Sequence, residues 1–234
     1  DGGIVVTYRD TTQTMGPIGS QSYLADAARS LVDSVRALST SSLTDVINEH
    51  PCSWSSNVFV DHPELRDRIP VSSGPRMKTN TFDRMAEVCL TVKPDDGHDY
   101  VEILGLSNRK RERRWVRSDY VRSPAGTDAF KVIIASADGA ALKAGRVIGT
   151  PTVSGPGAGF TQTFLSVGKF KTEAEAETCA SYLKTKFARA MLATLKTTQH
   201  NSAVKWNNVP LQDFTSTSDI DWSKSIPEID AQLY

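Results

Sequence analysis

The sequence offers little for covalent cross-linking or membrane insertion. Three cysteines occur among 234 residues, at Cys52, Cys89 and Cys179, an odd number with wide separations. This spacing gives no disulfide framework and no CxxC metal site. No apolar run approaches the length that a transmembrane helix requires. We therefore expect a cytoplasmic protein with buried free thiols and no membrane partner.

The chain also lacks the short motifs that mark common catalytic sites. GxSxG, HExxH, GKS and GKT are all absent, and the four histidines have no metal-ligand spacing. The Gly-rich run "GPGAGF" at 155–160 follows proline-containing text and precedes another strand, so it is better interpreted as a turn than as a cofactor loop. The sequence thus predicts no catalytic residue, no metal ligand and no cofactor in this chain.

One near-match to a nuclease site leaves an alternative open. The phrase "KPDDGHDYVEIL" places Asp95 on a turn and Glu102 on the next strand. Restriction-type nucleases pair an Asp with a Glu-x-Lys, so that two carboxylates hold a divalent metal and the lysine assists the attacking water. The third position here is Leu104, and "PDDG" also fits an ordinary hairpin turn. A stand-alone metal-dependent nuclease is therefore the weaker hypothesis.

Charge is balanced in total but not in distribution. The chain has 27 basic and 27 acidic residues, yet "NRKRERRWVR" at 108–117 sets six cations against one acid. Dense cations suit phosphate binding, and arginine can read guanine bidentately. We therefore predict DNA contacts from this cluster and from a second basic loop, "SGPRMKTN". The predicted contacts are Arg109, Lys110, Arg111, Arg113, Arg114, Arg117, Arg76 and Lys78. The alternative is a solvated hairpin whose cations pair with the acidic C-terminal text.

Hydrophobic periodicity predicts the fold class. Apolar residues recur at helical spacing over 20–38 and along one long segment, 172–196, which begins with a capping box formed by Thr172 and Glu175. A short helix is expected at 42–50, and strands at "NVFV", "EVCLTV", "DYVEILGL", "AFKVIIAS" and "TFLSV". The pattern predicts an α/β or α+β fold. It has a mixed sheet, one long C-terminal helix packed on that sheet, and an N-terminal helix.

Several phrases resemble the C-terminal region of bacterial N6-adenine DNA methyltransferases of restriction–modification systems, including the fused methylase–endonuclease enzymes. The phrases are "GGIVV", "FKVIIASADG", "VIGTP", "TQTFLSVGKF", "TEAEAETCASYLKTKFARAM", "KTTQ", "VPLQDF" and "IDAQLY". The resemblance is dense over 130–234 and thin over 15–126, where such a family would vary its DNA target.

The resemblance implies a sequence-specific DNA-binding fragment that is not catalytic alone. Its partners would be double-stranded DNA and a catalytic methyltransferase domain of the same parent chain, which would bring S-adenosylmethionine. The implied division is 1–14 as a remnant of the catalytic domain, 15–50 as a helical connector and 51–234 as the target-recognition domain. The chain opens at Asp1 in strand-like text and stops within helix-like text, so we expect an excised fragment. A protein-interaction scaffold, docking through the long helix, is a further alternative.

Overall fold

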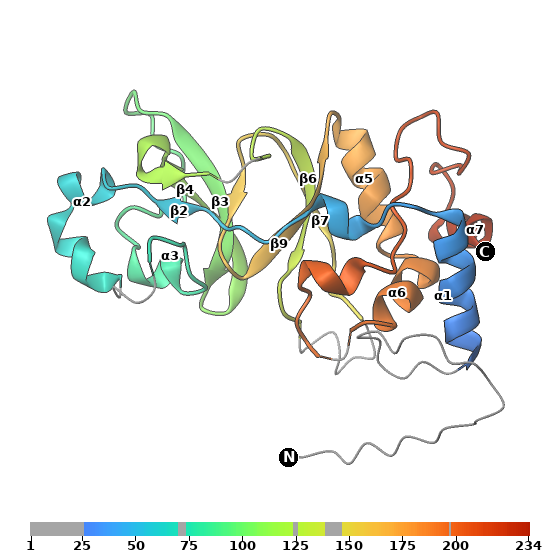
Figure 1. Cartoon of the computed structure of the whole chain (residues 1–234). Helices are drawn as coiled ribbons and strands as arrows, with labels where there is room; N and C mark the ends of the chain where they lie inside the picture. The colour runs from blue at the N-terminus through green and yellow to red at the C-terminus, as the bar shows by residue number, and fades with distance from the viewer. Residues whose placement is uncertain (1–25, 70–73, 124–125, 139–146, 197) are drawn as a thin grey trace, which may run out of the picture.

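The computed structural model describes residues 26–69, 74–123, 126–138, 147–196 and 198–234. Helices and strands are mixed, and the described strands form a four-stranded, a three-stranded and a two-stranded sheet. The fold is α+β, one of the two classes that the sequence predicts. Two lobes lie side by side, with α2 and α3 at one end and α1, α5, α6 and α7 at the other (Figure 1). The expected remnant at 1–14 and the first part of the connector, 15–25, fall outside the described residues.

The C-terminal lobe is built on an antiparallel sheet in the order β1-β9-β6-β7. Its strands are β1 (Ile47–Asn48), β6 (Phe130–Ala135), β7 (Thr152–Ser154) and β9 (Phe164–Phe170). Helix α5 (Glu173–Tyr182) packs across β6, β7 and β9. The same core is completed by three further helices, α6 (Lys186–Ala193), η5 (Ala203–Trp206) and α7 (Ile226–Leu233). The turn η1 (Leu43–Val46) contributes buried Leu43 to it.

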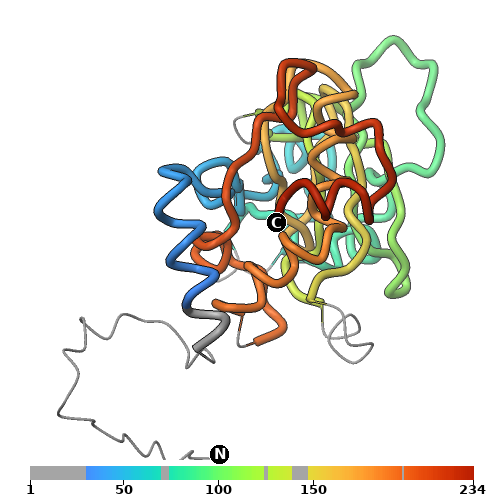
Figure 2. Tube along the Cα trace, turned by 90° about the vertical axis from the view of Figure 1, so that its right-hand side faces the viewer, coloured from blue at the N-terminus to red at the C-terminus, as the bar shows by residue number. Residues whose placement is uncertain are grey.

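The expected N-terminal helix is present as α1 (Asp26–Leu38), at the edge of this lobe in both views (Figures 1 and 2). Val32 is buried in the lobe's core, and Arg36 donates to the side-chain oxygen of Asn208 at 2.9 Å. The described residues of the expected connector therefore pack into the C-terminal lobe.

The long helix expected over 172–196 is interrupted at Thr185. The Thr185 hydroxyl donates to the carbonyl of Tyr182 at 2.7 Å, and its oxygen accepts from the Ala188 amide at 3.1 Å. This residue has extended backbone angles and caps α6, so one threonine ends the first helix and starts the second. The carboxylate of Asp230, on α7, accepts from the Phe187 amide at 2.8 Å and satisfies a further amide of that helix start.

The N-terminal lobe contains a three-stranded sheet in the order β4-β3-β8, formed by β3 (Tyr100–Ser107), β4 (Lys110–Arg117) and β8 (Gly159–Phe160). A two-stranded sheet of β2 (Ser53–Trp54) and β5 (Val121–Arg122) lies in the same lobe. Its short helices are α2 (Val58–Asp61), η2 (Pro63–Arg68), α3 (Thr81–Arg84) and η4 (Ser118–Tyr120). They enclose a second core that includes Trp54, Leu65, Met77, Phe82 and Ile103.

Three short segments differ from their predicted structure. Residues 57–60, predicted as a strand, begin α2, because Val60 and Asp61 both donate their amides to the carbonyl of Asn57. The strand predicted at 87–92 is a turn that only Leu90 joins to β4, through a bridge to Trp115. The helix predicted over 42–50 is reduced to η1, capped by Ser42 and Asp45, and is followed by β1. Short apolar runs fit either structure by periodicity, so tertiary pairing decides between them.

A small apolar cluster joins the lobes. Leu104 on β3, Ile133 on β6, Phe160 on β8 and Phe164 on β9 are all buried against one another. The hairpin of β3 and β4 is therefore anchored to both lobes, and its free end has a defined position on the molecule.

Candidate nucleic-acid interface

The basic cluster forms the second strand and the turn of a hairpin. Strands β3 and β4 pair from Tyr100–Arg117 to Ser107–Lys110, which leaves Asn108 and Arg109 as a two-residue turn. Both residues have positive φ, 49° and 64°, as a type I′ hairpin turn requires. Arg109, Lys110 and Arg111 are exposed at this end. We call residues 108–111 the hairpin tip.

The next two arginines, Arg113 and Arg114, contact opposite sides of the strand, as the two-residue period of β structure dictates. Arg113 forms an ion pair with Glu102 and reaches the carbonyl of Val153 on β7 at 3.4 Å. Arg114 binds Glu112 through two nitrogens, at 2.6 and 2.9 Å, and lies over the ring of Phe82. These cations are paired with acids from their own hairpin and not with the C-terminal acids.

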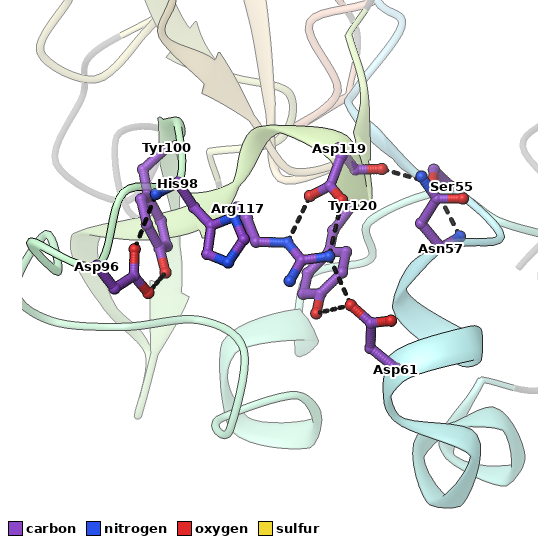
Figure 3. Close-up of polar contacts among 9 residues, drawn as sticks. All are labelled: Ser55, Asn57, Asp61, Asp96, His98, Tyr100, Arg117, Asp119 and Tyr120. Atoms are coloured by element: carbon purple, nitrogen blue, oxygen red, sulfur yellow. Dashed lines mark hydrogen bonds and ion pairs between the residues drawn. The ribbon is translucent and has the colours of Figure 1, made fainter.

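Arg117 lies at the centre of a polar network that ties β4 to α2 (Figure 3). Its guanidinium binds Asp119 at 2.6 Å and also binds Asp61, and it stacks on the Tyr120 ring at 4.0 Å. The Tyr120 hydroxyl donates to Asp61 at 2.7 Å. This bond and Arg117 lower the pKa of Asp61, while burial and Asp61 raise the pKa of Tyr120 to about 12. The acids that hold Arg117 would have to be displaced before it could bind DNA.

The Asp61→Asn variant should make stability less sensitive to acid. The Asp61 pKa lies below its ordinary value of 3.8, so its charge stabilises the fold above that pH and stops doing so as pH falls through the lowered pKa. Urea unfolding midpoints should therefore differ most between variant and native chain at pH 7 and converge as the pH falls below 3.8. Asp67→Asn, at an exposed acid on the neighbouring η2, serves as the control. If the urea midpoints of Asp61→Asn and of the native chain changed with pH in parallel, the ionised Asp61 would not stabilise the fold through this network.

The second basic loop lies on the same lobe beside β2. Arg76 forms an isolated bridge with Ser53. The buried Met77 donates its amide to the carbonyl of Cys52, and its own carbonyl accepts from the Gln162 amide. Arg76 is exposed and Lys78 half-buried. Both side chains line a cleft of about 170 Å³ that also contains Asn80 and Arg84 of the α3 region. This loop therefore opens onto a surface hollow.

Helix α3 connects the two basic segments. The Ser107 hydroxyl, at the end of β3 next to the tip, donates to the Asp83 carboxylate at 3.1 Å. The Phe82 ring lies so close to Gly105 that a Cβ there would be 2.5 Å from the ring. Arg84, on the same helix, lines the cleft. The two basic segments, more than twenty residues apart in sequence, therefore share one region of the surface.

Two cations of this region, Arg68 and Arg84, were not predicted from the sequence. Each donates an Nη1 hydrogen to the other's backbone carbonyl at 3.0 Å. Arg68 also pairs with Glu87 at 2.8 Å. The two residues are sixteen positions apart and neither belongs to a charge cluster, so no sequence pattern would have identified them. By contrast, no hydrogen bond or ion pair is assigned within the described residues to the side chains of Arg76, Lys78, Arg109 or Lys110.

The alternative nuclease site gains little from the structure. The Glu102 carboxylate pairs with Arg113, and Asp95 lies in the exposed loop before β3. Among the described residues, no group of three or more His, Cys, Asp or Glu side chains could hold a metal ion. The run at 155–160 forms a turn, with Gly157 at φ 79°, that leads into β8.

Within the described ranges, no helix combines the length and the apolar composition needed to cross a membrane. Comparison of the chain with protein-family models, with curated proteins and with solved structures found no match.

Proposed function

We propose that this chain is the sequence-specific DNA-binding part of an adenine-specific DNA methyltransferase of a restriction–modification system. The observation that carries the proposal is the shared surface of the hairpin tip, α3 and the loop containing Arg76 and Lys78. It gathers exposed cations in a chain of zero net charge. Such local concentration supports phosphate binding even when the total charge does not.

The shape of the tip supports a division between reading bases and holding phosphates. A two-stranded β-ribbon fits the major groove of B-DNA, where arginine can bind guanine bidentately. Arg109 and Arg111 lie at the exposed end of such a ribbon. The cleft cations lie to one side of it, along α3. We assign base contacts to the tip and backbone contacts to the region of the cleft.

The resemblance supports the choice of enzyme class. The phrases shared with adenine methyltransferases fall mostly in the C-terminal lobe, whereas the tip and the cleft lie where the resemblance is thin. The chain would direct a catalytic methyltransferase domain, carrying S-adenosylmethionine, to its DNA site. It would not transfer a methyl group by itself.

Duplex binding as a function of salt tests the proposal. Five cations, the half-buried Lys78 and the exposed Arg76, Arg109, Lys110 and Arg111, predict a slope of log K against log salt no steeper than about −4.5, the value reached if each meets its own phosphate. Fluorescence anisotropy with a labelled duplex measures it between 50 and 200 mM salt. A control variant with Lys171, Lys184 and Lys186 replaced by alanine loses three exposed cations of the other lobe and should bind as the native chain does. Absent or salt-independent binding would refute the proposal. Plasmid cleavage on adding magnesium would instead favour the nuclease.

Arg109 allows a prediction in which stability and binding change in opposite directions. A non-glycine residue with φ of 64° costs about 1–3 kcal/mol, and glycine is the preferred second residue of this turn. Glycine also increases the conformational entropy of the unfolded chain, which lowers stability by up to about 1 kcal/mol. The net effect of Arg109→Gly should therefore be to stabilise the protein by about 1 kcal/mol. The same change should weaken duplex binding, and thermal unfolding and anisotropy measure the two effects. If Arg109→Gly instead lowered stability and left duplex affinity unchanged, Arg109 would stabilise the fold and would not contribute to DNA binding.

A further inference from the structure

The cleft beside α3 combines apolar side chains with a concentration of positive charge. It is lined by Trp54, Ile69, Thr81, Met85 and Asn80 together with four cations, Arg68, Arg76, Lys78 and Arg84, and among the described residues no acidic side chain lines it. Trp54 and Met85 are almost fully buried and form an apolar floor. Four positive groups over such a floor repel one another unless an anion lies between them.

Two of these cations are held in place by the backbone. Arg68 and Arg84 bind each other's carbonyl at 3.0 Å, and each contact uses one of the five N–H donors of a guanidinium. The nearby acid, Glu87, pairs with Arg68, and both side chains of this pair are more than 40% exposed. An exposed ion pair contributes little to stability, so a phosphate can compete with it. Most of the donors therefore remain available to a ligand.

The size of the cleft limits what it can hold. Pockets for small molecules measure about 300–1,000 Å³. At about 170 Å³, this cleft is too small for a whole nucleotide, but it suits a single tetrahedral anion. Planar guanidinium groups bind phosphate oxygens in pairs, which suits such an anion.

We propose that Arg68, Arg76, Lys78 and Arg84 form a single phosphate-binding site that holds one phosphodiester of the DNA backbone next to the hairpin tip. The site rests on the proposed function, and it adds Arg68 and Arg84 to the expected contacts. A fixed phosphate at the cleft sets the register of the ribbon in the groove, because α3 joins the cleft to the tip through Asp83 and Ser107.

The number of phosphates bound gives a quantitative test. If four cations share one phosphate, replacing all four by glutamine should make the salt slope shallower by about 0.9, whereas four separate phosphates would change it by about 3.6. We expect the smaller change together with weaker binding at every salt concentration. The smaller variant Arg76→Gln/Lys78→Gln alters two side chains without assigned contacts, and circular dichroism checks that each variant is folded. An unchanged slope and affinity, or a change near 3.6, would overturn the single-phosphate site.

A second arm uses inorganic phosphate alone and separates this proposal from the function on which it rests. The indole N–H signal of Trp54 should shift on phosphate titration in the native chain, and the shift should be lost in Arg76→Gln/Lys78→Gln but kept in Lys184→Ala/Lys186→Ala. If the native chain binds phosphate and no duplex, the anion site stands, its source is a free phosphate compound, and the DNA assignment falls. If it binds duplex while Trp54 never responds to phosphate or to DNA, the cleft site falls and the DNA function stands.

Discussion

Leu183→Ala should lower the free energy of unfolding by about 2–5 kcal/mol, and Phe187→Ala by about 3–5 kcal/mol. Leu183 is fully buried and Phe187 is 4% exposed, both in the core that α5 and α6 share with β6 and β9. Truncation of either side chain removes apolar contacts and leaves a cavity that the surrounding helices and sheet cannot fully close. Urea denaturation with an unchanged m-value measures this loss directly.

Lys184→Ala provides the matched control. Its side chain is exposed between the same two helices, so the change in stability should stay within about 0.5 kcal/mol. A loss below 1 kcal/mol for both core variants would mean that the two helices are not integral to the fold, and would favour a docking role for them. The burial of Leu183 and Phe187 already argues against that alternative.

The burial of these helices was predictable although their break was not. A 3.6-residue apolar period identifies the face that packs on the sheet, and it holds for Leu183 and Phe187 on either side of Thr185. The interruption depends on a hydroxyl that bonds to Tyr182 and Ala188, and on Asp230 of a distant helix. A threonine within a helical pattern does not indicate whether a distant residue such as Asp230 will help to start a second helix there.

Lys131, on β6, is a second residue whose strand could be predicted from the sequence while its environment could not. The phrase "FKVIIA" predicts a strand, and β6 confirms it. The sequence does not indicate that Lys131 is 2% exposed, with its ammonium donating to the carbonyls of Thr127, Ala129 and Gly155. Burial lowers its pKa to about 8. Three carbonyls from two separate segments offset the cost of burying this charge, and only the folded chain brings them together.

The sequence predicts where the cations are concentrated along the chain, but not which of them are exposed on the surface. Sequence density cannot distinguish Arg109, at an exposed turn, from Arg113, which pairs with Glu102 across the hairpin. Strand pairing and alternation make that distinction, and they depend on the hairpin register. The cleft is less accessible still to sequence reasoning, because Arg68 and Arg84 meet only through backbone carbonyls.

The largest effect on DNA should come from the tip. Replacing Arg109, Lys110 and Arg111 together by alanine removes three exposed cations, which would make the salt slope shallower by up to about 2.7. If one of the arginines instead reads guanine, its loss would remove about 1–3 kcal/mol of discrimination, a factor of roughly 5–150 between sites. The choice between these outcomes is measurable with the chain alone, by sequencing the duplexes that it retains from a random pool.

We expect the native chain to enrich a defined motif and the tip variants to relax it at one or more positions. Arg111→Ala is the sharper single change, because Arg111 is exposed yet held in position over the Phe164 ring and by the Thr150 carbonyl at 3.1 Å. A side chain positioned in this way has less conformational entropy to lose when it binds a base edge. The cleft variant Arg76→Gln/Lys78→Gln should weaken binding to all sequences alike, and Lys184→Ala/Lys186→Ala should change neither motif nor affinity. If the cleft variant altered the motif while the tip variants left it intact, base reading would belong to the cleft and phosphate anchoring to the hairpin.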